Sequence, residues 1–233
     1  MATVVMALGG SLLRPEVEMR HRWLLELVSI IGDRVQSGDK FGLVVGGGAP
    51  AREGIRLASP IIDDVAHLDR IGIAATRLNA TIVREALSDG GIDVSRIIPV
   101  TIDEAVSELR NYGVVVMGGT EPGHTTDTVA ICLSNKAGAD KCVIATNVPK
   151  VFAEDPRENP EAESFDSLTL KQLQEIVGPP EHSRAGGSQV VDPIGVGEAL
   201  SSGMGLDILD GRDTEIIRKS LQGEDFSGTK VRG

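Results

Sequence analysis

The sequence has few cysteines, and their spacing excludes two classes of protein. Cys132 and Cys142 are too few for a disulfide framework, and they do not form the CxxC pair of many metal sites. The four histidines show no HExxH or other metal-ligating spacing. We therefore expect two free thiols in a reducing compartment and no metal site built from the protein alone.

Long apolar runs and an excess of positive charge are also missing. No run approaches the roughly 18 apolar residues that a membrane-spanning helix needs. Residues 1–13 are apolar but lack a basic leader and break at two glycines, so they predict a strand and not a signal peptide. The formal net charge of -11 repels nucleic acid and anionic lipid. We expect a cytoplasmic protein with no nucleic-acid or membrane partner, in which an anionic ligand needs a local pocket of amides and arginines.

Short apolar segments recur along the chain, and each ends in glycine or a polar turn. Six are expected to be β-strands: residues 3–8, 41–45, 96–100, 113–117, 141–146 and 205–209. They lack alternation of apolar and polar residues, which favours strands buried on both faces of a parallel sheet. Helices are expected at residues 15–37, 69–89 and 169–177. This alternation predicts an α/β fold, a three-layer αβα sandwich with a central, mostly parallel sheet.

No linker or change in composition divides the 233 residues, so we expect a single domain. Residues 154–166 and 178–193, rich in turn-forming residues, are expected to be surface loops. The expected helix at 69–89 carries an apolar face at three- and four-residue spacing, formed by Ile71, Ala75, Leu78 and Ile82. The apolar part of the first helix, residues 23–28, is expected mainly to pack on the sheet.

Three glycine-rich turns follow three of the expected strands: Gly9–Ser11, Gly46–Gly48 and Gly118–Thr126. Loops leaving the carboxyl ends of parallel strands gather at one edge of the sheet, where open α/β folds bind ligands. Glycine lets backbone amides approach a phosphate closely, and a following helix N-terminus adds its positive dipole. Three such turns in register favour a phosphate-binding site over ordinary tight connections. Because the sequence has no GxxxxGK[ST] and no GxGxxG after the first strand, neither a P-loop nor a Rossmann site is expected.

Four segments together resemble a known family. They are VVGGGAPARE (44–53), LDRIGIAATRLNA (68–80), MGGTEPGHTTDTVA (117–130) and TNVPKVFAEDPR (146–157). Their order and spacing are similar to those of the amino acid kinase superfamily, and within it to archaeal-type uridylate (UMP) kinases. The likeness runs from the first glycine turn to the GTKV near the C-terminus, and GGTxPGHTTDxVA is its most specific element.

The resemblance implies transfer of the γ-phosphoryl group of ATP, with Mg²⁺, to the phosphate of UMP. Residues 1–140 would bind the acceptor and residues 141–233 would bind ATP. The implied UMP-binding residues are Gly47, Asp69, Thr120, Glu121, Pro122, Gly123, His124, Thr125 and Thr126. The implied ATP-binding residues are Gly10, Ser11, Gly48, Arg52, Thr146, Asn147, Phe152 and Asp155. A homohexamer is implied as well.

Arg52 and Asp127 are the candidate catalytic residues. Phosphoryl transfer needs two anions brought into line and the charge on the transferred oxygens neutralised, which backbone amides and a guanidinium can supply. Arg52, in the first turn of the helix expected after Gly48, would clamp phosphate oxygens. From the residues alone, it could equally be an ordinary exposed arginine of the surface. Asp127 would orient cationic groups, or would simply interact with a helix dipole. We expect Thr125 or Thr126 to cap that helix and His124 to be a loop residue, because an ionised phosphate acceptor needs no general base.

The chain departs from the family at cationic positions. Many relatives carry a lysine in the first strand, where this chain has Ala7, and another after the DP of the late loop, where it has Gly197. We hypothesise that Lys150 supplies the missing cation. Phe152 replaces a tyrosine and preserves stacking on a base.

Two alternatives stay open. One is a kinase of another small acid or phosphate, such as carbamate, acetylglutamate or an isoprenoid phosphate. The other is a nucleotide-binding protein of the same fold with weak or no kinase activity.

Overall fold

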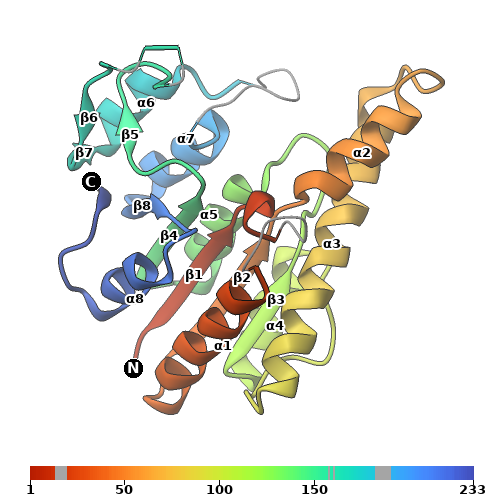
Figure 1. The fold of residues 1–233 in the computed structure, drawn as a ribbon, viewed down its shortest axis with the longest axis vertical. Helices are drawn as coiled ribbons and strands as arrows, with labels where there is room; N and C mark the ends of the chain where they lie inside the picture. The colour runs from red at the N-terminus through yellow and green to blue at the C-terminus, as the bar shows by residue number, and fades with distance from the viewer. Residues whose placement is uncertain (14–19, 157, 160, 182–189) are drawn as a thin grey trace.

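The computed structural model describes residues 1–13, 20–156, 158–159, 161–181 and 190–233 (Figure 1). Its strands are β1 (Thr3–Leu8), β2 (Lys40–Val45), β3 (Val114–Met117), β4 (Lys141–Thr146), β5 (Val151–Phe152), β6 (Ser164–Phe165), β7 (Ser167–Thr169), β8 (Leu206–Asp210) and β9 (Gly228–Arg232). Its helices are α1 (Arg20–Gln36), α2 (Gly48–Ala58), α3 (Val65–Asp89), α4 (Ile102–Asn111), α5 (Thr126–Ala137), α6 (Leu170–Val177), α7 (Pro193–Ser202) and α8 (Thr214–Gln222), with a short 3-10 helix, η1 (Gly10–Leu13).

The main sheet has seven strands in the order β3-β2-β1-β4-β8-β9-β7. Strands β3, β2, β1, β4 and β8 are mutually parallel. At one end of the sheet β9 runs antiparallel to β8, and β7 pairs in parallel with β9. A separate two-stranded sheet is formed by β5 and β6. The predicted mostly parallel sheet is confirmed, and β8 and β9 form an antiparallel pair near the C-terminus.

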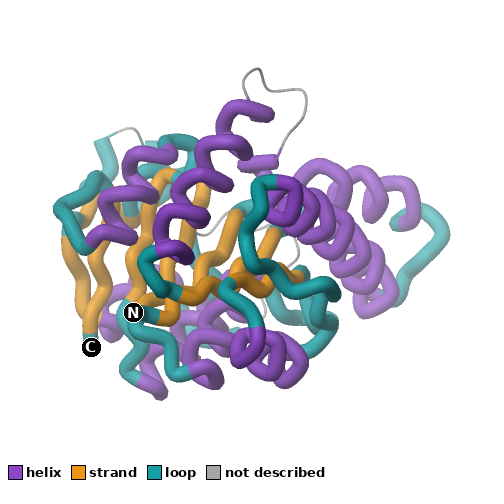
Figure 2. Tube along the Cα trace, turned by 90° about the horizontal axis from the view of Figure 1, so that it is seen from below, coloured by secondary structure: helices purple, strands orange, loops and turns teal. Residues whose placement is uncertain are grey.

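Alternate residues of each central strand enter two separate cores. In β1, Val5 and Ala7 face the core built with α4, α5, α6 and α7. Val4, Met6 and Leu8 face the core built with α1, α3 and α8. Figure 2 shows the strands between helices on both sides. Because both faces are covered, the strands can be apolar at every position, and the predicted αβα sandwich is confirmed.

The prediction of a strand at residues 96–100 is wrong. Only Val94 makes an isolated bridge, to Val114. Pro99 has no N–H to give to a ladder, and the amide of Ile97 bonds to the hydroxyl of Ser95 instead, at 3.3 Å. Side-chain hydrogen bonds therefore replace strand pairing in this segment.

The predicted helices are present with shifted boundaries. Helix α3 begins four residues earlier than predicted, because Asp64 caps it by accepting hydrogen bonds from the amides of Ala66 and His67. The predicted apolar face of α3 is not its core face: Leu78 and Ile82 are 56% and 46% exposed. The buried side of α3 consists of Thr76, Asn79, Ala80, Val83 and Leu87.

Two predicted loops and the first helix are partly outside the described residues. Helix α1 covers 20–36 of the predicted 15–37, and residues 14–19 are not described. The loop at 154–166 contains the short strand β6, and residues 157 and 160 within it are not described. Within 178–193, residues 182–189 are not described, and α7 begins at Pro193.

Helix α1 is attached to the C-terminal part of the chain through Trp23. Its side chain is 5% exposed, and Nε1 donates a 2.7 Å hydrogen bond to the carbonyl of Gly211. Gly211 directly follows β8 and donates its own amide to the carbonyl of Thr146 at the end of β4, at 2.7 Å. The predicted packing of α1 on the sheet is thus confirmed for Trp23, while Leu25 is 67% exposed.

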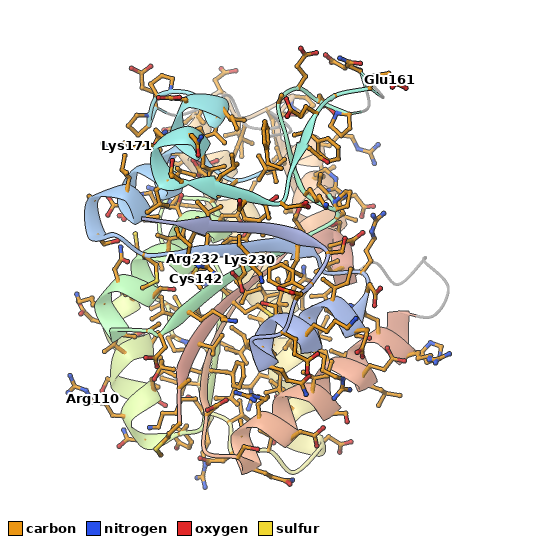
Figure 3. All side chains as sticks on the ribbon, turned by 90° about the vertical axis from the view of Figure 1, so that its left-hand side faces the viewer. Arg110, Cys142, Glu161, Lys171, Lys230 and Arg232 are labelled. Carbon is orange, nitrogen blue, oxygen red and sulfur yellow. The ribbon has the colours of Figure 1, made fainter. Side chains whose placement is uncertain are left out.

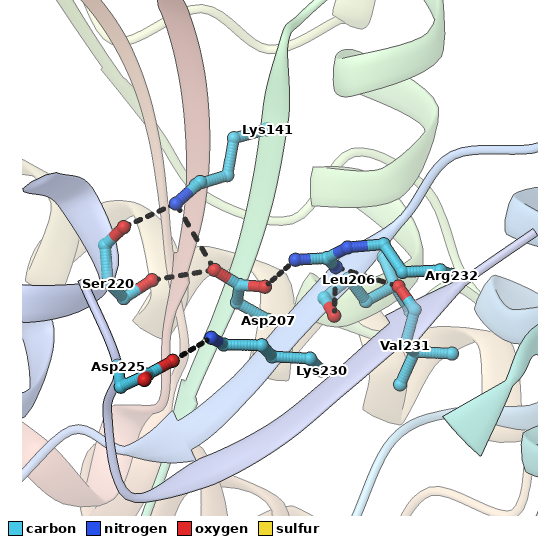
Figure 4. A network of polar contacts seen from close by, with 8 residues as sticks. All are labelled: Lys141, Leu206, Asp207, Ser220, Asp225, Lys230, Val231 and Arg232. Atoms are coloured by element: carbon cyan, nitrogen blue, oxygen red, sulfur yellow. Dashed lines mark hydrogen bonds and ion pairs between the residues drawn. The ribbon is translucent and has the colours of Figure 1, made fainter. Parts of the chain in front are cut away.

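The amino ends of β4 and β8 carry an ionic network around a buried aspartate, drawn in Figure 4. Asp207 is 1% exposed and accepts hydrogen bonds from Ser220 Oγ at 2.8 Å and Arg232 Nη2 at 2.7 Å. Lys141 Nζ lies 3.2 Å from the same carboxylate. Lys230 and Arg232, labelled in Figure 3, both project from β9. This network joins β4, β8, β9 and α8 at the edge opposite the glycine turns.

Both cysteines are free, and Cys142 is buried in β4. Over the described ranges, none of the helices combines the length and the apolar character needed to cross a membrane.

Candidate active site

The first two glycine turns touch each other at the carboxyl ends of β1 and β2. A Cβ atom on Gly10 would overlap the backbone nitrogen of Gly48, and one on Gly46 would lie 2.5 Å from the nitrogen of Gly10. Gly48 has φ +58°, in the left-handed region. Only glycine allows the two backbones to approach this closely, so the convergence predicted from the sequence is present in the fold.

The third turn, residues 118–126, follows β3, the neighbour of β2. Because the sequence predicts that this turn binds the acceptor, we call it the acceptor loop. It lies on helix α3. The amide of Gly119 donates to Thr76 Oγ1 at 2.7 Å, and the amide of Gly123 donates to Asp69 Oδ2 at 2.9 Å. Asp69, predicted to bind a sugar, therefore already holds the loop through one of its two oxygens.

Two further side chains of α3 hold backbone carbonyls of the turns. Arg77 Nη2 donates to the carbonyls of Gly119 and Thr120, at 3.3 and 3.5 Å. Asn79 Nδ2 donates to the carbonyls of Gly46 and Gly47, at 2.7 and 3.1 Å. Thr76, Arg77 and Asn79, which lie within a single turn of helix α3, thus contact the acceptor loop and the glycine turn at residues 46–48.

Two helices begin at this edge. Helix α2 starts directly after Gly47, and α5 starts after Thr125. Of the two caps predicted from the sequence, Thr125 is the N-cap, and its hydroxyl accepts from the amide of Thr128 at 3.3 Å. The amides of a helix N-terminus and its dipole favour a bound anion.

The remaining residues of the acceptor loop differ in exposure. Glu121, Pro122 and Thr125 are exposed, whereas Thr120, Gly123, His124 and Thr126 are half-buried. His124 Nδ1 lies 3.3 Å from Glu121 Oε1. This contact within the loop fits the predicted role of His124 as a loop residue.

Arg52 and Ser11 lie at the rim of the two touching turns. Ser11 is half-buried in η1. Arg52 is exposed, and since α2 begins at Gly48 it stands in the second turn of the helix, not in the predicted first turn. Its guanidinium is therefore available from the solvent side.

Asp127, in the first turn of α5, is half-buried. In the described part of the chain its carboxylate has no hydrogen-bond or ion-pair partner. Desolvation by the surrounding protein, followed by the charge of Asp192, raises the pKa of Asp127 from its ordinary 3.8 to about 7. Asp192 caps α7, accepting from the amide of Ile194 at 2.9 Å and from Thr128 Oγ1 at 3.0 Å. Two carboxylates thus stand together where neither has a cation from the described residues.

A cavity of about 350 Å³ lies beyond the end of β4. Its lining includes three of the predicted ATP-binding residues, Asn147, Phe152 and Asp155. Apolar side chains complete the walls, among them Ile176 of α6. Thr146 is outside the lining, at the end of β4. A mostly apolar cavity with few polar groups and one aromatic ring fits a nucleobase.

The two positions where the resemblance places a lysine are closely packed here. Ala7 is 1% exposed within β1, between β2 and β4. A Cβ on Gly197 would lie 3.1 Å from Pro180 Cβ. Lys150, hypothesised as a substitute cation, forms an ion pair with the exposed Asp166, and its role as that cation stays a prediction.

Sequence reasoning missed four residues of this region: Thr76, Arg77, Asn79 and Asp192. The three residues of α3 look like ordinary polar positions of a helix, and no local signal separates them from solvent-facing ones. Asp192 did have a signal, because aspartate followed by proline is a typical helix start.

Comparisons with known proteins agree with this architecture. The amino acid kinase family matches residues 2–207. A protein named uridylate kinase from Methanospirillum hungatei is 34% identical over 99% of this chain and 95% of its own length. Another of the same name from Pyrococcus abyssi is 35% identical over 98% of each chain. The crystal structure of uridylate kinase from Archaeoglobus fulgidus has a TM-score of 0.85 and 36% identity, covering 99% of this chain and 100% of that one.

The match extends over the glycine turns, the acceptor loop and the cavity beyond β4, and it is nearly complete in both directions. The chain belongs to the amino acid kinase family.

Proposed function

We propose that the chain is a nucleoside monophosphate kinase that transfers the γ-phosphoryl group of ATP to UMP, giving UDP and ADP. The observation that carries this is the meeting of two glycine turns and the acceptor loop at one sheet edge, next to a cavity of nucleobase size. The relatives named uridylate kinase support UMP as the acceptor.

The acceptor would lie over residues 118–126 and Gly47, with the free oxygen of Asp69 directed to its sugar. The donor phosphates would lie against Gly10, Ser11 and Gly48, with Arg52 closing over them from the solvent side. The adenine would enter the cavity with Phe152. On this assignment residues 1–140 serve mainly the acceptor and residues 141–233 mainly ATP.

The chemistry is an in-line displacement. An oxygen of the UMP phosphate forms a bond to the γ-phosphorus, and the bond from that phosphorus to the β–γ bridging oxygen breaks, leaving its electron pair on ADP. Backbone amides of the glycine turns stabilise the charge that spreads over the transferred oxygens. No covalent intermediate with the protein is needed.

Asp127 fits a divalent cation that arrives with ATP. Its carboxylate lacks a partner within the described ranges, stands beside a second carboxylate, and has a pKa raised by desolvation and that charge. Oxygen ligands of this kind suit Mg²⁺, which binds proteins through one or two carboxylates together with substrate phosphates. When bound, Mg²⁺ would neutralise phosphate charge, and Asp127 with Asp192 would hold it near the donor.

We also propose a cytoplasmic homo-oligomer, a hexamer by resemblance to the family. The exposed stripe of α3 has Leu78 and Ile82 at its centre, Arg70 toward one end and Glu85 toward the other. Two copies of this stripe packed antiparallel would bring Leu78 of each copy against Ile82 of the other, as a two-fold contact requires. Light scattering of Leu78→Asp should show a smaller particle than wild type, and an unchanged mass would contradict the α3 contact.

Coupled assays of ADP release with UMP, CMP and AMP, and with carbamate, acetylglutamate and an isoprenoid phosphate, test the proposal. Turnover with UMP well above that with the other two nucleotides is expected. Turnover only with carbamate, acetylglutamate or an isoprenoid phosphate would replace UMP by another acceptor.

A second candidate is a nucleotide-binding protein with little turnover, favoured by the closely packed positions at Ala7 and Gly197. It predicts calorimetric binding of UMP with no ADP release above the rate of ATP hydrolysis in the absence of UMP.

A further inference from the structure

The acceptor loop takes its shape from helix α3. A Cβ on Gly118 would lie 2.5 Å from Thr76 Oγ1 and 2.9 Å from the backbone nitrogen of Arg77. A Cβ on Gly119 would lie 3.3 Å from Ile73 Cγ1. The loop backbone therefore rests closely on one turn of the helix, against the side chains of Ile73 and Thr76 and the backbone of Arg77.

Arg77 determines which way two peptide groups of this loop face. Its Nη2 donates to the carbonyl oxygens of Gly119 and Thr120, so both carbonyls point toward α3. The described residues contain no cis peptide bond, and in a trans peptide the N–H points opposite to the C=O. The amides of Thr120 and Glu121 must then point away from α3.

The charge of Arg77 is also unusual for its surroundings. The side chain is half-buried, and its Nε has no hydrogen-bond partner among the described residues. A guanidinium keeps its charge when half-buried and can hold two carbonyl oxygens at once.

We infer that Arg77 is a positioning residue for the acceptor: by holding the carbonyls of Gly119 and Thr120, it directs the amides of Thr120 and Glu121 toward the acceptor phosphate. The inference rests on the proposed function, because it names UMP as the acceptor. It assigns a role to a side chain of α3 that does not itself touch the substrate.

Steady-state kinetics of Arg77→Met test this. Loss of a charged hydrogen bond to the loop should raise the KM for UMP about tenfold, while the KM for ATP stays within about twofold. Arg84→Met is the matched control, because Arg84 is also a half-buried arginine of α3 but pairs with Glu85. It should leave both KM values unchanged.

Arg77→Lys separates positioning from charge. Lysine keeps the charge but lacks the planar guanidinium, so its KM for UMP should lie between those of wild type and Arg77→Met. A lysine variant equal to wild type overturns the positioning role. An equal rise in both KM values, or the same effect in Arg84→Met, also overturns it. If Arg77→Met does not fold, the lysine variant and its control carry the test.

Hydrogen exchange without substrate distinguishes failure of this inference from failure of UMP as acceptor. The amides of Thr120 and Glu121 should exchange faster in Arg77→Met than in wild type or Arg84→Met, because their peptide groups are no longer fixed. Should wild type prove inactive on UMP, faster exchange still supports loop positioning by Arg77. Unchanged exchange together with an unchanged KM overturns it.

Discussion

An aspartate at the amino end of the parallel sheet and one at its carboxyl end differ in whether their carboxylates have bonding partners. At the amino ends of β4 and β8, Asp207 is 1% exposed and bound by Ser220, Arg232 and Lys141. At the carboxyl ends, Asp127 lacks a partner among the described residues and faces the charge of a second aspartate. The first arrangement stabilises the fold, and the second is unfavourable until a ligand brings positive charge. A charged residue that lowers the folding stability of the ligand-free protein, as Asp127 does, therefore helps to locate the candidate active site.

The largest expected effect is on catalysis at the carboxyl end. Asp127→Asn should lower kcat roughly 100- to 1000-fold, because the carboxylate that would orient the cations is lost. Asp89→Asn, an exposed carboxylate at the end of α3, is the control and should leave kcat unchanged. Rates of UDP formation under saturating substrates measure this. A normal kcat in Asp127→Asn would remove Asp127 from the mechanism.

The same substitution should affect stability in the opposite direction, with a defined pH dependence. The folded pKa of Asp127, about 7, is above its ordinary 3.8, so its contribution to stability is complete below pH 3.8 and is lost as pH rises toward 7. At pH 8 wild type should therefore be less stable than Asp127→Asn, by up to about 4 kcal/mol. Urea unfolding of both proteins at pH 5 and pH 8 measures the difference. A difference that is independent of pH would show that Asp127 is not desolvated.

Asp207 should respond as a structural residue. Asp207→Ala leaves Lys141 and Arg232 without their shared carboxylate, and should lower the free energy of unfolding by about 3 kcal/mol. The KM values of the folded enzyme should not change, since the network lies at the opposite edge of the sheet. Asp225→Ala, which breaks an exposed pair with Lys230, is the control and should leave the unfolding midpoint unchanged. A changed KM in Asp207→Ala would show that the network at the amino ends also affects substrate binding, and would contradict a purely structural role for Asp207.

Removing one partner of Asp207 should have the smallest effect. Lys141→Met leaves the bonds from Ser220 and Arg232 intact, so a loss of about 1 kcal/mol is expected in chemical denaturation. A loss as large as that of Asp207→Ala would mean that Lys141 alone neutralises the buried charge.

The convergence of the glycine turns could be predicted because its cause is local. Gly10, Gly46 and Gly48 are required where two backbones touch, and glycines after apolar segments leave a visible pattern. The strand at residues 96–100 could not be excluded as easily, because apolar residues surround Pro99 and the competing hydrogen bond from Ser95 depends on the tertiary fold.

The contacts of α3 could not be predicted for a different reason. Periodicity shows that Leu78 and Ile82 share a face, but it does not tell whether that face meets the sheet, a second copy or solvent. In the same way, Arg77 and Asn79 become recognisable only when the loops they hold are placed beside them. The carbonyl groups they bind belong to segments more than thirty residues away in the chain.

The bond between Trp23 and Gly211 gives the protein an intrinsic optical reporter. The chain has a single tryptophan, so its ultraviolet-excited emission comes from one known location. That indole donates to the carbonyl of Gly211, whose amide bonds to Thr146 beside the proposed adenosine site. Nucleotide-induced movement at the end of β4 would alter the polarity around the ring, and titrations could follow it without an added dye.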